Sequence, residues 1–597
     1  MCRGIGARCT LRWQPGWRRQ ISRYAAALRV VDLDRRSLMT GVGSLAAASL
    51  LPEVQAGASA AIDVPVEEPL ELRSMISRER ENFLAAMARE EIPGAAVCLL
   101  HQRKPVWVEG LGVTDTQSRG RVGARTLFSI QSTSKNFTAA AIMIAVQRGV
   151  LDLDKPITDY LREFSVQSRF ESMPQRKMTL RLLLSHRAGF THEAPVGNNF
   201  DPAFPDFETH IRSISRTWLR YPVGERYRYS NLGVDLAGYI LQLVAGKPFA
   251  ACLQSMIFDP LAMADSTVAT EVYARRSDRA IGHEKGYATV PLKTPLIPSG
   301  GVYTSARDMA NYLAFHLNRG QFDGKRVLEE SLWREMHSFS LGGDYGLGVI
   351  RTELRYGNTP IRMLNHKGGG FGFGCVCNYC PEAGLGWMAM FNRPTAAAYR
   401  FGTGLLEGLL TRRYGARTAR LPVQDLSPIE LQRTQLAQFT GSYIGRDFYG
   451  EIKFENGALG IRAASGFTPL QFTSPVDLFV AGAEGEAVTY RYFAAIQAEP
   501  AHLECAIGEN SLDYNDGGDE PAGPNSAAWD AIVGPYQIDQ WGERAQSLIV
   551  HRKNGYLYLN DWRLTEFEPK LFFTADGEAV DFRTDEPTWR NIRLLRA

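Results

Sequence analysis

The last third of the chain repeats itself, and this repeat constrains the fold more than any single residue does. Three short segments recur in register, at offsets of 93, 98 and 92 residues: 439–443 (FTGSY) as 532–536 (IVGPY), 456–459 (NGAL) as 554–557 (NGYL), and 485–488 (GEAV) as 577–580 (GEAV). Each copy has alternating apolar residues, an Asn-Gly pair typical of a tight hairpin and a second glycine turn. We therefore expect two related small antiparallel β-barrel domains.

Shifts in composition mark the limits of these domains. A polar, Arg-rich connection at 412–433 interrupts the apolar pattern before it, and Asp, Gly, Pro and Asn fill 510–527. Such clusters are typical of linkers. The sequence therefore predicts a first domain at 62–421, β-barrel domain 1 at 433–508, a linker at 509–527 and β-barrel domain 2 at 528–597.

The first domain alternates amphipathic helical stretches with short apolar strands. The segments 95–100 and 106–108 are typical of the two strands of a hairpin, and 137–150 is typical of a helix that stops at Arg148-Gly149. This alternation is typical of an α/β or an α+β fold.

The extreme N-terminus has the pattern of an export signal. The first 36 residues carry nine Arg and two Asp, and Arg35-Arg36 is followed by an apolar stretch at 38–51 that is too short to span a membrane. Small-residue cleavage sites follow, so 1–60 is predicted to be a basic leader with a Tat-like signal peptide. The alternative is a disordered basic tail before a short core helix. We expect an exported, periplasmic or secreted bacterial protein with no membrane span once the signal is removed.

Charge and cysteine usage exclude several classes. Beyond residue 60 the chain has 58 basic against 61 acidic residues, so no net positive field attracts nucleic acid. Cys375, Cys377 and Cys380 lie close together, but they lack a second ligand pair at a suitable distance, and their strand-like context favours buried thiols. We expect no metal, no cofactor and no disulfide framework; a homo-oligomeric state stays open.

The candidate chemistry begins at Ser132-Thr133-Ser134-Lys135. A serine in the first turn of a helix can direct its backbone N–H at an oxyanion, and a lysine three residues later lies on the same face. A partly buried lysine can lose its proton and activate the serine hydroxyl. The alternative is an N-cap serine beside a solvated lysine.

Two further elements supply the groups that the serine and the lysine lack. In Tyr229-Ser230-Asn231, a phenol can relay a proton and a carboxamide can hold a substrate amide. In His366-Lys367-Gly368, followed by Gly369 and Gly370, the glycines let a substrate backbone lie against a strand edge and expose a backbone N–H. The structural alternatives are a buried tyrosine beside a helix cap and a Gly-rich hairpin.

These three elements, in this order, resemble those of the penicillin-binding proteins and class C β-lactamases, with their D-aminopeptidase and esterase relatives. The resemblance covers about residues 70–410 and implies an α+β fold, arranged as an α/β sandwich, for this domain. It includes connecting segments such as 149–154 (GVLDLD), 183–189 (LLSHRAG), 257–261 (IFDPL) and 300–305 (GGVYTS). One departure matters, because His366 stands where lactamases usually carry Lys, as it does in the esterases and aminopeptidases. This departure weakens a β-lactamase interpretation.

The resemblance implies a role for each motif residue. Ser132 is the acylated nucleophile, Lys135 and Tyr229 form the proton-transfer pair, and the backbone amides of Ser132 and Gly369 form the oxyanion hole. Asn231, His366 and Gly368 line the substrate. His186 could be the base of a Ser–His pair, but its place in a connecting segment favours a satisfied structural histidine.

The sequence therefore predicts a serine hydrolase that forms a covalent acyl-enzyme with peptides, among them linear peptides and peptides with D-residues. The two barrels favour an aminopeptidase, because a barrel loop narrows the cleft in D-aminopeptidases. The alternatives are an esterase, an amidase or a weak β-lactamase of the same family. A catalytically idle protein that binds cell-wall fragments is an alternative of another class.

Overall fold

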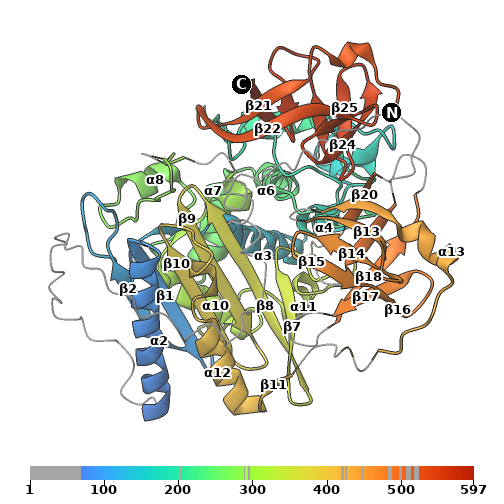
Figure 1. The fold of residues 1–597 in the computed structure, drawn as a ribbon. Helices are drawn as coiled ribbons and strands as arrows, with labels where there is room; N and C mark the ends of the chain where they lie inside the picture. Colours follow the sequence, from blue (N-terminus) through green and yellow to red (C-terminus); the bar gives the residue numbers. More distant parts are fainter. Residues whose placement is uncertain are drawn as a thin grey trace, which may run out of the picture.

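We describe the computed structural model of the chain (Figure 1). It describes residues 69–597 except 202–204, 288–289, 294–295, 419–422, 424–425, 446–447, 482–486, 496–500, 506–511 and 517–522. The predicted leader at 1–60 therefore lies outside the described residues, as do Gly485 and Glu486 of the third repeated segment.

A seven-stranded antiparallel sheet forms the centre of the first domain, with the strand order β11-β7-β8-β9-β10-β1-β2. The chain runs through a meander from β7 to β10, and β10 then pairs with the N-terminal hairpin of β1 and β2. The strands are β1 (Gly94–His101), β2 (Lys104–Gly112), β7 (Ile350–Tyr356), β8 (Thr359–Gly370), β9 (Phe373–Cys380), β10 (Leu385–Phe391) and β11 (Arg417–Thr418). This sheet confirms the predicted N-terminal hairpin.

Helices cover both faces of the sheet, as an α/β sandwich requires (Figure 1). On one face lie α2 (Leu70–Arg89) and α12 (Thr403–Tyr414). The other face carries a thicker helical layer: α3 (Ser134–Gln147), α4 (Leu180–Leu184), α5 (Phe207–Ser213), α6 (Asn231–Ala245), α7 (Phe249–Leu253), α8 (Thr270–Arg275), α9 (Ile297–Gly300), α10 (Ala306–Leu317) and α11 (Glu330–Met336).

The helix α3 lies at the centre of this layer, and 12 of its 14 residues are buried. A helix that is apolar on all sides belongs in a core. It ends where the sequence predicts, with Arg148 as its C-cap and Gly149 in the left-handed region at φ 71°. It begins at Ser134 instead of Phe137, because a 3₁₀ turn, η1 (Gln131–Thr133), leads directly into it.

The C-terminal third forms two antiparallel β units, as the repeat predicts (Figure 1). The second is a closed eight-stranded barrel: β21 (Gly534–Gln540), β22 (Glu543–Lys553), β23 (Tyr556–Leu559), β24 (Trp562–Glu568), β25 (Leu571–Thr574), β26 (Ala579–Asp581), β27 (Thr588–Trp589) and β28 (Ile592–Arg596). The first is a nine-stranded sheet, ordered β15-β14-β13-β12-β20-β19-β18-β17-β16, which forms a nearly closed barrel. The short helix α13 (Arg433–Leu436) precedes it.

The strands of the nine-stranded sheet are β12 (Gly441–Ile444), β13 (Tyr449–Glu455), β14 (Ala458–Ala463), β15 (Gly466–Pro469), β16 (Gln471–Phe472), β17 (Asp477–Ala481), β18 (Ala487–Phe493), β19 (His502–Cys505) and β20 (Leu512–Asp516). Both predicted Asn-Gly turns close hairpins, with φ values of 50° and 85° at Asn456 and Gly457 and of 49° and 76° at Asn554 and Gly555. Positive φ at both central residues is the signature of a type I′ turn.

One boundary of the sequence analysis is wrong. The strand β20 falls inside the predicted linker at 509–527, yet it pairs with both β12 and β19 at the middle of the sheet. Its composition is polar because Asp513 faces arginines of the first domain, which bury and neutralise it. A polar run therefore predicted a linker where the chain forms an interface strand.

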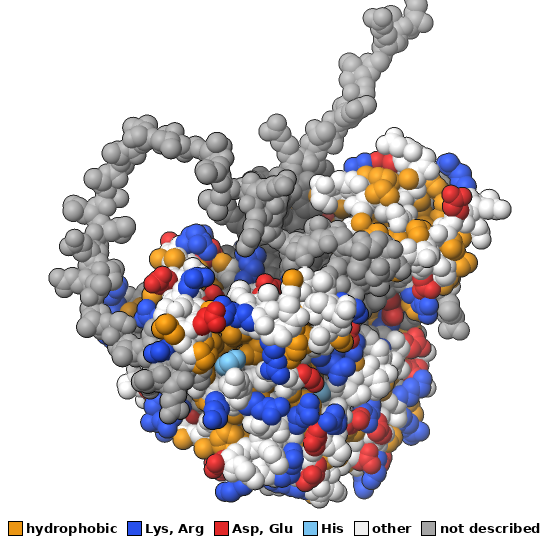
Figure 2. Space-filling view, turned by 90° about the horizontal axis from the view of Figure 1, so that it is seen from below, with side chains coloured by type: hydrophobic (Ala, Val, Ile, Leu, Met, Phe, Trp, Pro, Cys, Tyr) orange, Lys and Arg blue, Asp and Glu red, His pale blue; other side chains and the backbone are white. Residues whose placement is uncertain are grey.

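The remaining short strands form two antiparallel pairs: β3 (Phe128–Ser129) with β4 (Tyr303–Thr304), and β5 (Gln321–Phe322) with β6 (Lys325–Arg326). Within the described part of the chain, no single helix meets the length and apolarity of a membrane span. The segments Asn231–Ala245 and Phe249–Phe258 together reach the length and apolarity of a span, but the chain bends by 80° between them. Figure 2 shows Lys and Arg interspersed with Asp and Glu over one face of the molecule.

Candidate active site

The turn that carries Ser132 is held by backbone pairing on its N-terminal side. The strand β3 ends at Ser129 and pairs with β4, and the chain then enters η1 with Gln131 at φ 47°. This left-handed residue turns the chain from the strand into the helix, so that Ser132 is half-buried and Lys135 is fully buried in the first turn of α3.

Lys135 joins the first two predicted motifs. Its Nζ lies 3.2 Å from Ser132 Oγ, 2.7 Å from Asn231 Oδ1 and 3.0 Å from the carbonyl oxygen of Ser299. The amide and carbonyl oxygens can only accept hydrogen bonds. A neutral lysine amine would donate its two N–H groups to them and keep its lone pair for the Ser132 hydroxyl. The geometry therefore suits a general base.

Sequence reasoning missed Ser299, which supplies this carbonyl oxygen from α9. The Ser299 N–H donates to Asp235 Oδ1 at 2.8 Å, and Asp235 Oδ2 lies 3.2 Å from His210 Nε2. Burial lowers the pKa of His210, but the hydrogen bond to Asp235, the charge of Asp235 and the hydrogen bond to the Val196 carbonyl oxygen together outweigh burial, so the pKa is raised overall. Asp235 lies four residues after Asn231 in α6, and this helical spacing is the only signal that could have identified it.

The second motif leads into α6. Ser230 is the N-cap of this helix, and its Oγ accepts from the Leu232 N–H at 3.1 Å, so Asn231 is the first helical residue. The Tyr229 ring is half-buried, and Lys135 Nζ lies 4.7 Å from its centroid. The structure thus brings Ser132, Lys135, Tyr229 and Asn231 together.

His186 supports this motif from behind. Its Nδ1 accepts from the Ser230 N–H at 3.2 Å, and its ring lies 4.3 Å from the Tyr229 ring, centroid to centroid. Burial, reinforced by the positive charge of Lys135, lowers its pKa well below the usual value, so the ring is neutral. With Nδ1 as an acceptor, the proton of the ring is on Nε2.

His366 lies on β8 and is held as one tautomer. Its Nδ1 is 2.8 Å from the carbonyl oxygen of Lys367, which requires a proton on Nδ1, and its Nε2 is 2.9 Å from the Tyr345 hydroxyl. Burial and the charge of Lys135 lower the pKa of His366 to about 3. The ring is therefore neutral near pH 7, and Tyr345 donates to Nε2. Tyr345, which sequence reasoning did not identify, also contacts the Tyr229 ring.

The glycines of the third motif allow a close approach that no other residue permits. A Cβ atom at Gly368 would lie 2.0 Å from the Ile130 carbonyl oxygen, and one at Gly369 would lie 2.3 Å from the Tyr399 hydroxyl. β8 therefore passes directly beside the turn that carries Ser132. The pairing of β7 with β8 ends at Asn365, so, among the described residues, 366–370 pairs with β9 on one side and with no strand on the other.

The three clustered cysteines are buried thiols of β9, as the sequence predicts. Cys375 lies 3.1 Å from Thr133 Oγ1 and donates to the Ile130 carbonyl oxygen at 3.2 Å. Burial raises its pKa to about 12, so the thiol stays protonated and does not compete as a nucleophile. Across the described ranges, no group of three or more His, Cys, Asp and Glu residues could hold a metal ion.

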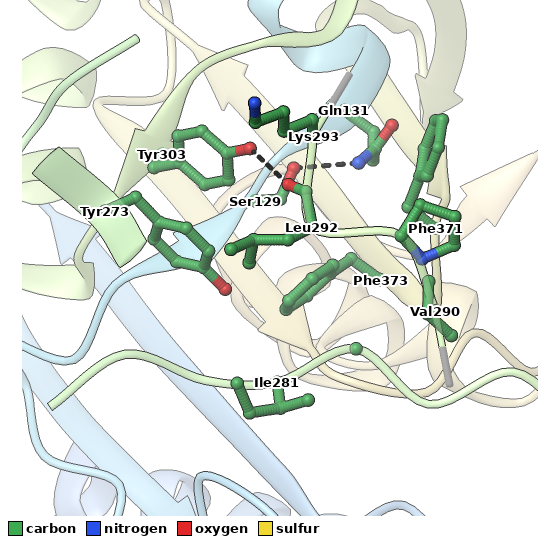
Figure 3. Close-up of a pocket in the computed structure, with 12 residues that line it drawn as sticks. Ser129, Gln131, Tyr273, Ile281, Val290, Leu292, Lys293, Tyr303, Phe371 and Phe373 are labelled. Atoms are coloured by element: carbon green, nitrogen blue, oxygen red, sulfur yellow. Dashed lines mark hydrogen bonds between the residues drawn. The ribbon is translucent and has the colours of Figure 1, made fainter. Parts of the chain in front are cut away.

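A small pocket lies beside η1 (Figure 3). The rings of Tyr273, Tyr303, Phe371 and Phe373 line it together with Gln131, whose side chain donates to Ser129 Oγ at 2.8 Å. Its volume is about 30 Å³, and Ser132 is not among the residues that line it.

A comparison with family models places this site among known proteins. The model described as Beta-lactamase matches residues 80–409, more than half of the 597 residues. The chain belongs to the Beta-lactamase family. Homologues with the Beta-lactamase fold are serine hydrolases that act on amides and esters.

Two curated relatives of this Beta-lactamase-family chain come from distant organisms. Unguisins hydrolase ungD of Aspergillus violaceofuscus (strain CBS 115571) is 25% identical over 389 residues, which cover 58% of this chain and 65% of that protein. Protein flp of Staphylococcus aureus (strain COL) is 24% identical over 237 residues, which cover 39% and 47%. The chain thus covers less than two thirds of the length of either relative.

Solved structures support the fold beyond the matched domain. SurE with D-Leu superposes with a TM-score of 0.53 at 20% identity and covers 75% of this chain and 100% of that chain. A second structure of SurE gives a TM-score of 0.52 at 20% identity, with 74% and 99% coverage. At this identity the likeness concerns the fold alone.

Proposed function

We propose that this serine hydrolase cleaves amide bonds of peptides, including linear peptides and peptides with D-residues, through an acyl-enzyme on Ser132. The contact of Lys135 Nζ with Ser132 Oγ, Asn231 Oδ1 and the Ser299 carbonyl oxygen carries this proposal. Two fixed acceptors leave the third direction of the amine for the serine proton, so the lysine is held ready to act as a base.

In the first step, Ser132 Oγ attacks the substrate carbonyl carbon while its proton passes to Lys135 Nζ. The backbone N–H groups of Ser132 and Gly369 stabilise the oxyanion. Tyr229 then passes a proton to the leaving amine, and the C–N bond breaks to give the acyl-enzyme. In the second step, water gives up a proton to the same pair and attacks the ester, which releases the acid and restores the Ser132 hydroxyl.

On the side away from β9, no described strand pairs with 366–370, and this favours a peptide over a compact ester because an extended backbone can pair there. Asn231 and Gly368 line this path. The similarity to a hydrolase of unguisins, and to SurE solved with D-Leu, is in keeping with peptides and D-residues as substrates. The neutral His366 offers no cation for the carboxylate of a penicillin.

The second barrel supports an aminopeptidase-like narrowing of the cleft. Trp541 lies at the tip of the hairpin between β21 and β22, where its ring centroid is 5.7 Å from that of Phe371 and 4.9 Å from that of Tyr287. Phe371 follows directly after β8. The indole N–H of Trp541 donates to the Asn199 carbonyl oxygen at 2.9 Å, which fixes the tip of the hairpin against the first domain. The hairpin thereby closes one end of the edge that would bind substrate.

The decisive test pairs a covalent probe with a substrate library. Ser132→Ala should lose both labelling by a fluorophosphonate and turnover, and Lys135→Ala should lose about 10² to 10⁴-fold in kcat/KM. Ser118→Ala, at an exposed serine, is the matched control and should label normally. Labelled Ser132→Ala, or turnover at the wild-type rate, would reject the nucleophile.

The library then separates the substrate classes. D- and L-aminoacyl amides, linear peptides and p-nitrophenyl esters are compared on the purified protein by kcat/KM. A preference for peptides and aminoacyl amides supports the proposal, whereas esters alone would leave an esterase. Probe labelling with no turnover of any member would leave a protein that binds cell-wall fragments.

Export by the Tat route is part of the proposal, and it rests on Arg35-Arg36 and the apolar stretch behind them. The charge balance of the remaining chain supports a soluble peptide or small molecule, and not nucleic acid, as its partner.

A further inference from the structure

The segment before Tyr229 is unusually rich in buried positive charge. Arg220 and Arg226 are 8% and 3% exposed, and the side chain of Arg228, next to Tyr229, is 13% exposed. The Tyr221 ring lies beneath all three guanidinium groups, at 5.6, 4.4 and 5.0 Å from their central carbons. Buried cations of this kind need carboxylate partners.

The carboxylates come from both C-terminal units. Asp513 on β20, 1% exposed, accepts from Arg226 at 2.7 Å with one oxygen and from Arg228 at 3.0 Å with the other. In the second barrel, Asp576 and Glu578 pair with Arg220 at 3.1 and 3.0 Å. The two C-terminal units thus supply the carboxylates that neutralise this arginine-rich segment of the first domain.

Asp513 is the critical member for Tyr229. Arg226 Nε and Nη2 are buried without a hydrogen-bond partner in the described part of the chain, so its neutralisation depends on Asp513. β20 is paired on both sides, by β12 and β19, and its carboxylate is therefore rigidly placed.

Asp513 is linked to Tyr229 through one residue, Arg228, which binds Asp513 and precedes Tyr229 in the chain. The Arg228 N–H donates to the His186 carbonyl oxygen at 2.9 Å, and on the other side of Tyr229 the Ser230 N–H donates to His186 Nδ1. Tyr229 is thus held between two anchored residues.

Loss of the Asp513 charge leaves the backbone bond of Arg228 in place, but its guanidinium group loses its carboxylate and keeps the Tyr227 carbonyl oxygen, at 3.0 Å, as an acceptor. The Arg226 guanidinium loses its carboxylate as well. Both guanidinium groups are then drawn toward solvent, which shifts the backbone next to Tyr229.

We propose that Asp513 is a positioning residue for Tyr229, and that the nine-stranded sheet completes the active site through its pairs with Arg226 and Arg228. The proposal rests on the proposed function, in which Tyr229 transfers a proton. Since a displacement of about 1 Å can cost about 10²-fold in rate, the sheet is needed for turnover although it contributes no group to the reaction.

The test compares Asp513→Asn with Asp477→Asn. Asp477, on β17 of the same sheet, pairs with Arg491, which is 60% exposed, and so controls for the loss of an ion pair elsewhere in the unit. In the full-length protein we expect Asp513→Asn to lower kcat about 10 to 100-fold with KM changed less than about threefold, and Asp477→Asn to leave both unchanged. Active sites are counted by fluorophosphonate labelling, and kcat is expressed per labelled site.

A charge-balanced double variant separates positioning from general damage. Asp513→Asn with Arg226→Met restores the net charge of the cluster, and we expect it to recover at least about tenfold of the lost kcat. A wild-type kcat per labelled site in Asp513→Asn, or no recovery in the double variant, would overturn the proposal. If Asp513→Asn does not fold, Asp513→Glu keeps the charge and shifts it by one methylene. A wild-type kcat in that variant would also overturn it.

These outcomes are distinct from failure of the proposed function. If Ser132→Ala and the wild type turn over alike, the nucleophile is wrong whatever Asp513 does. If Ser132→Ala is inactive and Asp513→Asn is fully active, the nucleophile stands and the positioning role falls.

Discussion

Acid should destabilise the first domain before its carboxylates titrate, because four of its histidines are buried in the neutral form. Burial lowers the pKa of His366 to about 3 and that of His337 to about 4, and it holds the pKa values of His186 and His316 well below the usual range. In the unfolded chain each of these groups takes up a proton near pH 6.5.

The sign and the size follow from proton linkage. Each histidine stabilises the folded protein fully above pH 6.5, and this stability is lost as the pH falls, because only the unfolded chain binds the proton. At pH 5 the loss is about 2 kcal/mol each for His366 and His337, or about 4 kcal/mol for the two. His186 and His316 change the stability in the same direction. A domain is typically stable by about 5 to 15 kcal/mol, so we expect a large loss of stability near pH 5.

His210 does not offset this loss. Its pKa is raised, since the hydrogen bond and the charge of Asp235 together with smaller effects outweigh burial. Its stabilising contribution is therefore fully present below pH 6.5 and is lost only as the pH rises through the raised value. Below pH 6.5 both the folded and the unfolded chain hold this proton. His210 therefore does not change the slope of the free energy of unfolding against pH.

Urea unfolding at a series of pH values between 7.5 and 5, followed by tryptophan fluorescence, measures the slope. Trp107 and Trp387 report on the first domain, since both are fully buried in it. His337 lies in the helical layer, where its Nε2 contacts the Tyr379 hydroxyl. His337→Gln should therefore reduce the slope by about 1.4 kcal/mol per pH unit. A free energy of unfolding that is constant from pH 6.5 to 5, or a slope that His337→Gln does not reduce, would refute the reasoning.

Three further predictions concern the site and the leader. Gly368→Ala should cost at least about 100-fold in kcat/KM in a folded protein, since its Cβ would force β8 away from Ile130, and wild-type kinetics would contradict the close approach. Benzylpenicillin should be a poorer substrate than peptides and esters, because His366 is neutral; steady-state kinetics with penicillin ahead would reverse this ranking. Replacing Arg35 and Arg36 with Lys should retain precursor in the cytoplasm, and an unchanged distribution between cell fractions would reject the Tat route.

The interface also decides how the C-terminal units can be tested. Deletion from about residue 510 would remove Asp513, Asp576 and Glu578 together. Their arginine partners would then have no carboxylate to neutralise their positive charge. Such a truncation would lose activity whether or not a hairpin restricts access. Trp541→Ala is the sharper change: if the hairpin restricts the cleft, larger acyl donors should gain in kcat/KM, and an unaltered substrate profile would remove the main reason for preferring an aminopeptidase.

The sequence by itself determined the parts of this protein that depend on local chemistry. The Asn-Gly turns follow from the left-handed backbone that glycine and asparagine tolerate, and alternation of apolar residues predicts the strands around them. The spacing of Ser132 and Lys135 follows from one turn of helix. The three catalytic motifs could therefore be identified from short segments.

The tertiary structure decided everything that depends on residues far apart in the chain. Ser299 and Tyr345 carry no motif, and they matter only because folding brings one to Lys135 and the other to His366. Asp513 lay in a segment that composition assigned to a linker. The buried negative charge of Asp513 is explained by its contacts with Arg226 and Arg228, because a buried ion is tolerated only where a partner of opposite charge is in place.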